Sequence, residues 1–119
     1  MDEDIKKWID SAEEDLDVAK SNLENEKLRA AGFFAQQAAE KSLKAFYIKK
    51  FKELCKIHDL VILARKVEAS QEIIEICDEL EPLYTATRYP DDIRNYSAGD
   101  IEDLIQKSEM VIKWVKEKL

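Results

Sequence analysis

Residues 33–50 read FFAQQAAEKSLKAFYIKK, and this stretch decides the fold that the rest of the chain must support. Alanines alternate there with bulky aromatic residues. The segment from Leu28 to Leu54 is therefore predicted as one long helix that is apolar around much of its circumference. We expect this helix to lie at the centre of a bundle, where its alanines let neighbouring helices approach closely.

The sequence on either side predicts the helices that surround it. Apolar residues recur in steps of three and four from Ile5 to Leu23, which is typical of an amphipathic helix that starts near Asp2 and Asp4. Three more helical segments are predicted, and their approximate ranges are 58–67, 70–84 and 97–119.

Two residues in these later segments bear on where helices begin. Pro82 falls inside the fourth apolar pattern, so either that helix kinks there or a new helical turn restarts with proline at its first position. Ser97 followed by Asp100 is similar to a capping box and predicts the start of the last helix.

Composition agrees with a helical domain. The chain has 119 residues, enough for one domain, and only two glycines and two prolines, which disfavours sheets that need frequent tight turns. No apolar run approaches the roughly 18 residues that cross a bilayer, and the acidic start does not resemble a signal peptide. We therefore expect one all-α domain over residues 1–119, an antiparallel up-and-down bundle of four to five helices, located in the cytoplasm and not in a membrane.

The net charge of −7 conceals a basic stretch. Residues 41–66 carry eight lysines and arginines against two acidic residues, so this part has a charge of +6 and the remainder −13. A basic end on an acidic body attracts phosphate-bearing ligands or an acidic partner. The alternative is that lysines favour the C-terminal end of a helix, where the helix dipole is negative.

Polar residues on the central helix form the first candidate site. Gln36, Glu40 and Lys44 recur at four-residue steps and so share one helix face between apolar neighbours, where buried polar groups must be paired. Glu40 is expected to act as a structural group that receives an arginine, with Arg88 the first candidate. Two interpretations remain open: a phosphate or nucleotide pocket lined by Lys41, Lys44 and Arg88, or a structural pair that ties a loop to the helix.

The loop RYPDDIRNY at residues 88–96 and the single histidine supply the other candidates. Two adjacent carboxylates in the loop are weak evidence for a metal, so we expect none, and Asp92 is expected to cap a helix or pair with Arg94. His58 stands beside Asp59 at a predicted helix start. It is either a general base or, together with Asp59, a capping and packing residue.

Three motifs in order carry a family resemblance: FFAQQAAEKSLKAFYIKK, then IHDLVILARKV, then LYTATRYPDD. With WIDSAEEDLDVAKSNL at the start, nearly the whole chain resembles the HEPN domain (higher eukaryotes and prokaryotes nucleotide-binding). The resemblance implies a helical bundle that commonly forms a homodimer. Such proteins are often encoded beside a minimal nucleotidyltransferase, in pairs considered toxin and antitoxin. By resemblance, the ligand-binding residues are Lys41, Lys44, His58 and Arg88.

One departure from the family bears on catalysis. Ribonuclease members carry an arginine followed four to six residues later by a histidine, whereas no histidine follows Arg88 or Arg94 here. We therefore assign no catalytic residue. The expected function is a non-catalytic module that pairs with a nucleotidyltransferase and binds a nucleotide or phosphate, with no cofactor and no DNA. The alternatives are a metal-independent RNase toxin with a degenerate site, in which His58 acts, and a purely structural dimeric scaffold.

Overall fold

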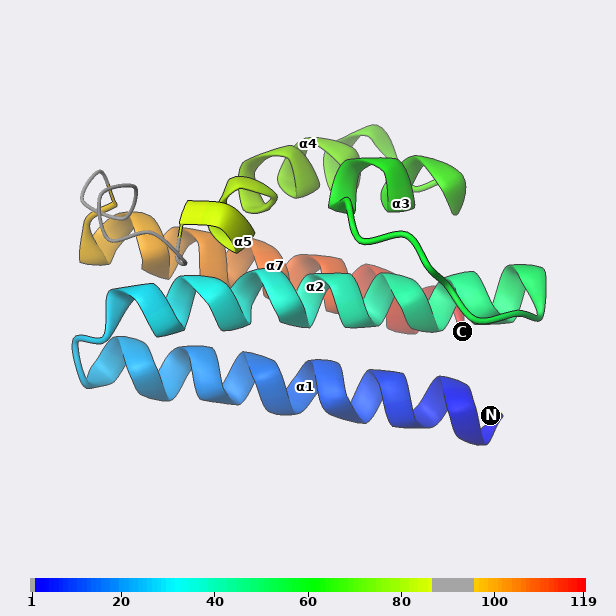
Figure 1. Cartoon of the computed structure of the whole chain (residues 1–119), viewed down its shortest axis with the longest axis horizontal. Helices are drawn as coiled ribbons and strands as arrows, with labels where there is room; N and C mark the ends of the chain where they lie inside the picture. Colours follow the sequence, from blue (N-terminus) through cyan, green and yellow to red (C-terminus); the bar gives the residue numbers. More distant parts are fainter. Residues whose placement is uncertain (1, 87–95) are drawn as a thin grey trace.

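A computed structural model describes residues 2–86 and 96–119 of the chain (Figure 1). Within these ranges every regular element is a helix, which confirms the predicted all-α class. None of the described helices is both long and apolar enough to cross a membrane. The helices are α1 (Glu3–Glu24), α2 (Leu28–Phe51), α3 (Leu60–Lys66), α4 (Gln71–Leu80), α5 (Pro82–Ala86) and α7 (Ala98–Lys118).

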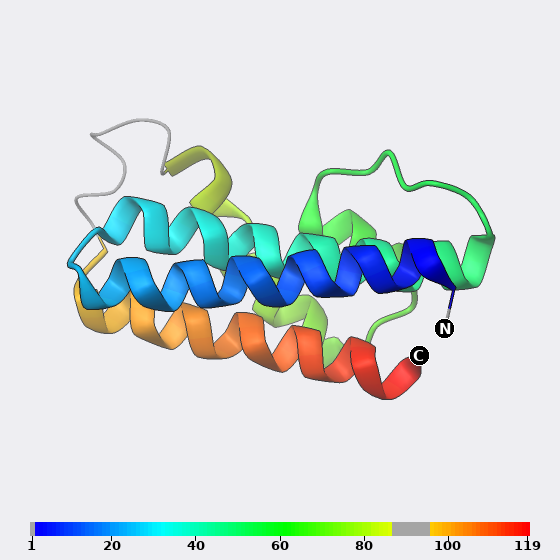
Figure 2. The same ribbon diagram turned by 90° about the horizontal axis from the view of Figure 1, so that it is seen from below.

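The helices form an up-and-down bundle around α2, as predicted. Helices α1, α2 and α7 run side by side along the length of the molecule, and α1 runs opposite to the other two (Figures 1 and 2). The return path from the end of α2 towards the start of α7 is broken into the shorter α3, α4 and α5, which cover another side of the bundle. Helix α2 consequently contacts all the other described helices.

The capping residues act as the sequence indicates. The Asp2 side chain accepts a hydrogen bond from the Asp4 backbone N–H at 2.7 Å and caps α1. Ser97 and Asp100 form a reciprocal capping box at the start of α7, with hydrogen bonds of 3.0 and 2.9 Å. Of the two alternatives for Pro82, the structure shows the second, because this residue begins the separate helix α5.

The predicted end of the central helix was wrong by three residues. Helix α2 ends at Phe51 and not at Leu54, because Lys52 adopts the left-handed conformation at φ 58° and stops the helix. An irregular segment, residues 52–59, then leads back along the bundle to α3 (Figure 1). This early end brings His58 back towards the middle of α2.

The core explains the alanine-rich sequence of α2. Its residues Ala31, Ala35, Ala38, Ala39 and Ala45 are all fully buried. The approach of α7 is close enough for the Ser108 hydroxyl to donate a hydrogen bond of 2.6 Å to the Ala35 carbonyl oxygen.

Two other features belong to this core. Cys77 is buried, and burial raises the pKa of its thiol to about 12. Phe46 and Trp114 are partly buried against the core and contact each other edge to face with ring centroids 5.5 Å apart.

Candidate functional site

A row of polar side chains on α2 is buried in the bundle. Gln36, Glu40 and Lys44 are 0%, 6% and 5% exposed. The Lys44 Nζ lies 2.9 Å from Glu40 Oε2, and the Gln36 amide donates to Glu40 Oε1 at 3.3 Å. The predicted spacing therefore gives one connected row, in which each polar group has a partner, as burial requires.

His58 reaches this row from the segment 52–59. Its Nδ1 atom lies 3.3 Å from Lys44 Nζ and 3.6 Å from Glu40 Oε2, while the side chain as a whole is 79% exposed. Nδ1 can accept from the Lys44 ammonium or, when it carries the proton, face the Glu40 carboxylate, so in either state this nitrogen is directed at the buried pair. On the α1 side, Lys44 Nζ lies 5.6 Å from the centre of the Trp8 ring, a cation–π contact.

Lys41, the other lysine predicted for this site, contacts α1 instead. Its ammonium lies 2.8 Å from Asp15 Oδ2 and donates to the Ser11 hydroxyl at 2.8 Å. Asp15 is itself only 8% exposed, so the Lys41 ion pair is what compensates this buried carboxylate. The structure thus brings Glu40, Lys44 and His58 together, whereas the charge of Lys41 is neutralised at the α1–α2 interface.

The sequence also predicted Arg88 and Asp92 as site residues. Both fall within 87–95, outside the described residues, so the expected contact between Glu40 and Arg88 stays a prediction. Across residues 2–86 and 96–119, no group of three or more His, Cys, Asp or Glu side chains is placed to hold a metal ion.

Two carboxylates accept hydrogen bonds at the start of α3, directly after His58 in the sequence. The Asp59 side chain accepts from the Ile62 N–H at 2.9 Å, which is the capping role considered for the His58–Asp59 pair. Glu81, which follows α4, accepts from the Leu60 N–H. Burial raises the pKa of Glu81, while the hydrogen bond from Leu60 acts in the opposite direction. Neither Trp8 nor Glu81 was singled out from the sequence.

The raised pKa of Glu81 predicts a pH-dependent contribution to stability. An acid whose pKa is higher in the folded state favours folding below its unfolded pKa, and this contribution is lost as pH rises through the folded value. We expect Glu81→Gln to remove this loss of stability at higher pH. The glutamine amide oxygen still accepts a hydrogen bond from the Leu60 N–H, and the amide does not ionise. Urea unfolding at several pH values from about 4 to about 8 should show the variant gaining stability relative to wild type as pH rises. A difference in stability between variant and wild type that stays the same over this pH range would contradict this account.

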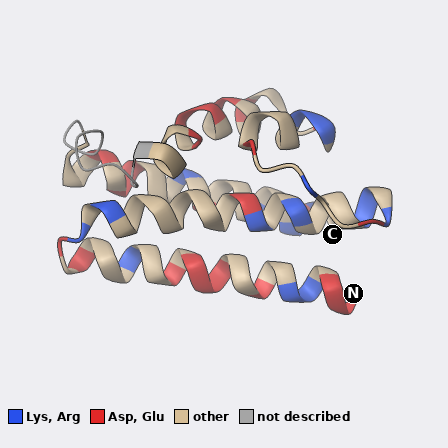
Figure 3. Cartoon of the chain, in the orientation of Figure 1, with Lys and Arg blue, Asp and Glu red and all other residues tan. Residues whose placement is uncertain are grey.

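The basic stretch is concentrated at one end of the bundle (Figure 3). Two of its lysines bind carbonyl oxygens: Lys49 Nζ donates to Leu119 at 2.7 Å and Lys50 Nζ to Val67 at 3.0 Å. These contacts favour the interpretation in which lysines serve helix ends. Within the described part of the chain, Lys52 and Lys56 form no ion pair.

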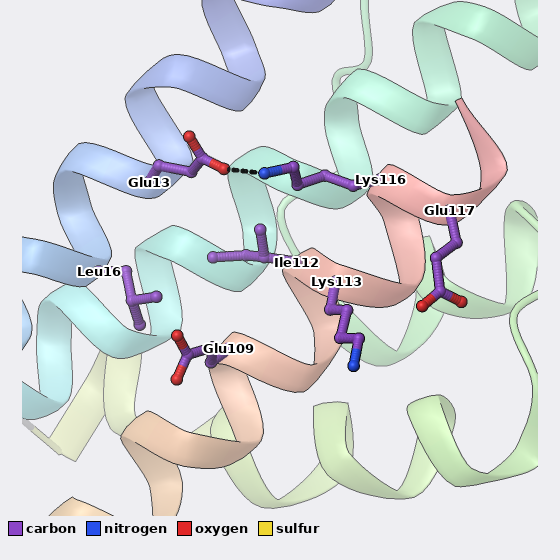
Figure 4. Close-up of a pocket in the computed structure, with 7 residues that line it drawn as sticks. All are labelled: Glu13, Leu16, Glu109, Ile112, Lys113, Lys116 and Glu117. Carbon is purple, nitrogen blue, oxygen red and sulfur yellow. Dashed lines mark hydrogen bonds and ion pairs between the residues drawn. The ribbon is translucent and has the colours of Figure 1, made fainter.

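The groove between α1 and α7 contains none of the predicted site residues. Figure 4 shows Leu16 and Ile112 at this groove, and the ion pair between Glu13 and Lys116 bridges its two helices. Its volume is about 510 Å³. Five of its seven lining residues are charged, with both signs represented, and none of the seven is a predicted site residue, so the polar row on α2 remains the candidate site.

Comparisons with known proteins agree with the resemblance seen in the sequence. The family model for the HEPN domain matches residues 5–118. The structure of TT1696 from Thermus thermophilus is similar over 97% of this chain and 98% of that one, with 26% identity and a TM-score of 0.88. ST0689, an archaeal HEPN homologue, is 25% identical with a TM-score of 0.81, covering 96% of both chains. No curated protein sequence matches the chain. The chain belongs to the HEPN domain family.

Proposed function

We propose that this chain is a non-catalytic HEPN module that forms a homodimer, pairs with a minimal nucleotidyltransferase and binds a nucleotide or other phosphate ligand. The observation that carries the non-catalytic part is the position of His58, the only histidine in the sequence. Its Nδ1 atom lies 3.3 Å from Lys44 Nζ and 3.6 Å from Glu40 Oε2, so this nitrogen is engaged by the buried Lys44–Glu40 pair.

This position does not suit metal-independent RNA cleavage. Such cleavage needs a basic group that removes a proton from the 2′-hydroxyl. The Nδ1 atom of His58 is directed at the buried Lys44–Glu40 pair, so this nitrogen does not face a substrate hydroxyl. The sequence also lacks an arginine followed four to six residues later by a histidine. Partner binding is therefore the better-supported function, and the nucleotidyltransferase is proposed from the family resemblance.

A phosphate group fits the donors that this cluster presents. The His58 side chain is largely exposed and can donate to a phosphate oxygen through the ring nitrogen that does not face Lys44, whereas the charge of Lys44 itself is paired with Glu40. By family resemblance, Lys41 and Arg88 complete the ligand-binding set. Since Lys41 is held by Asp15 and Ser11, its part in binding requires that pair to open.

Co-purification tests the proposed pairing. The chain and the nucleotidyltransferase encoded beside it should be co-expressed with an affinity tag on the transferase alone, then passed over a size-exclusion column at micromolar concentration. We expect one peak that contains both proteins. Two proteins that elute separately would count against the pairing.

Thermal-shift titration tests the phosphate ligand separately. ATP and inorganic phosphate should each be added to the wild type, to His58→Ala and to Lys52→Ala, in which an exposed lysine outside the cluster is removed. A ligand bound only by the folded state stabilises it, by about 2.7 kcal/mol at a concentration one hundred times its Kd. We expect a rise in Tm for wild type and Lys52→Ala but not for His58→Ala. Equal shifts in all three would place any binding elsewhere.

A further inference from the structure

We infer that the outer surface of the α3–α4 hairpin binds the same surface of a second copy of this chain. This hairpin face is defined by the groove residues Val61, Arg65, Ile74, Glu75 and Asp78, together with Ile62, the exposed residue that follows Val61 on α3. The inference rests on the homodimer in the proposed function and assigns the face that forms it.

The hairpin face carries apolar side chains beside a groove. Ile62 is 56% exposed, and Val61 and Ile74 are half-buried. Val61 and Ile74 line a groove of about 390 Å³ between α3 and α4. Two half-buried β-branched residues line the groove, and the exposed Ile62 follows one of them directly on α3; together they supply the apolar part that a protein interface needs.

The same groove holds charges of opposite sign that do not pair within one copy. Arg65 lines it together with Glu75, Asp78 and Glu79. Glu79 pairs with Lys107 at 2.8 Å. In the described part of the chain, no ion pair involves Arg65, Glu75 or Asp78. These three residues are therefore available to a partner.

The order of these charges makes the face complementary to itself. The end of α3 is basic, with Arg65 and Lys66, whereas α4 has four acidic residues and no basic one (Figure 3). A two-fold axis through the hairpin places the basic end of one copy against the acidic helix of the other. Arg65 then faces Glu75 and Asp78 of the second copy. A nucleic acid or an anionic membrane suits this face less well, because α4 repels polyanions.

The dimensions of the molecule also accommodate such an interface. The principal extents are 39 × 23 × 22 Å, and α3 and α4 lie along one of the long sides. Helices α3 and α4 are 7 and 10 residues long and cover part of that side, so an interface of the standard size, about 800 Å² per partner, also includes surface next to the hairpin. Because both copies use the same face, the assembly closes at two copies and leaves no open binding surface of this kind.

Charge reversal and rescue test the inference. Sedimentation velocity should compare wild type with Arg65→Glu, with Glu75→Lys/Asp78→Lys, and with all three substitutions in one chain. We expect the first two variants to weaken the dimer about tenfold or more, since like charges then face each other. The triple variant should regain wild-type association, because its charges are exchanged but still opposite. Lys52→Glu is the matched control, since it reverses an exposed cation outside the face and should leave the dimer unchanged.

The outcomes distinguish the claim that this face forms the interface from the claim that the chain forms a dimer. A wild-type chain that stays monomeric at about 100 μM would refute both the homodimer and the face, because association is driven by protein concentration. A dimer that persists unchanged through both reversals, and also through Ile62→Asp, would refute the face and leave the homodimer intact. A triple variant that fails to regain association, while remaining folded by circular dichroism, would also overturn the charge pairing.

Discussion

Replacing Glu40 by alanine is expected to lower the free energy of unfolding by about 3–5 kcal/mol. The Lys44 and Glu40 side chains are 7% and 8% exposed, and their charged atoms lie 2.9 Å apart. Removing the carboxylate leaves a buried ammonium whose remaining contacts are an imidazole nitrogen and the Trp8 ring. Neither contact neutralises the charge of Lys44. The free-energy cost of keeping that charge out of water is then no longer offset. Urea unfolding monitored by circular dichroism measures the loss.

Two further variants show whether burial is the reason for that loss. Glu79→Ala removes a carboxylate from the more exposed pair with Lys107, so its cost should stay below about 1 kcal/mol. The double variant Glu40→Leu/Lys44→Met removes both buried charges and should regain most of the stability, because apolar replacements of buried ion pairs are often neutral or stabilising. If Glu40→Ala costs no more than Glu79→Ala, the polar row is not the buried structural element described here.

The second large effect is expected at the centre of α2. Leu43 is fully buried on the helix that contacts all the other described helices. Leu43→Ala should lower the free energy of unfolding by about 2–5 kcal/mol, through lost apolar burial and the cavity left behind.

Leu54→Ala is the matched control for this cavity, because Leu54 is 67% exposed in the segment that follows α2. The same deletion of methyl and methylene groups should change the stability there by no more than about 0.5 kcal/mol. Similar losses at the two positions would show that α2 is not the centre of the core.

The predictions that succeeded depend on local sequence. Helix periodicity identified α1, α2 and α7, and capping chemistry located the starts at Asp2 and Ser97, because hydrogen bonds to neighbours two or three residues away decide them. The four-residue spacing placed Glu40 and Lys44 on one face, where burial among apolar neighbours requires a partner; the structure pairs them with each other, whereas the sequence named Arg88 for Glu40. Each of these signals is contained within a few residues.

The features that the sequence missed depend on contacts between distant residues. His58 reaches Lys44 across 14 positions only because α2 stops early at Lys52 and the chain turns back. The sequence grouped Lys41 with Lys44. Residues three positions apart on a helix can contact different neighbours, and Lys41 forms its ion pair with Asp15 of α1. Nothing in the local pattern around Glu81 indicates that it meets the start of α3, since α4 lies between them in sequence.

An RNA cleavage assay is the most direct test of the claim that this HEPN module is non-catalytic, with its only histidine engaged by Lys44. Purified wild-type protein, His58→Ala and Arg88→Ala should each be incubated with labelled single-stranded RNA in the presence of EDTA. The account predicts that none of the three cleaves the RNA above the rate seen in buffer. Cleavage by the wild type that both substitutions abolish would contradict it, and would establish the chain as a metal-independent ribonuclease.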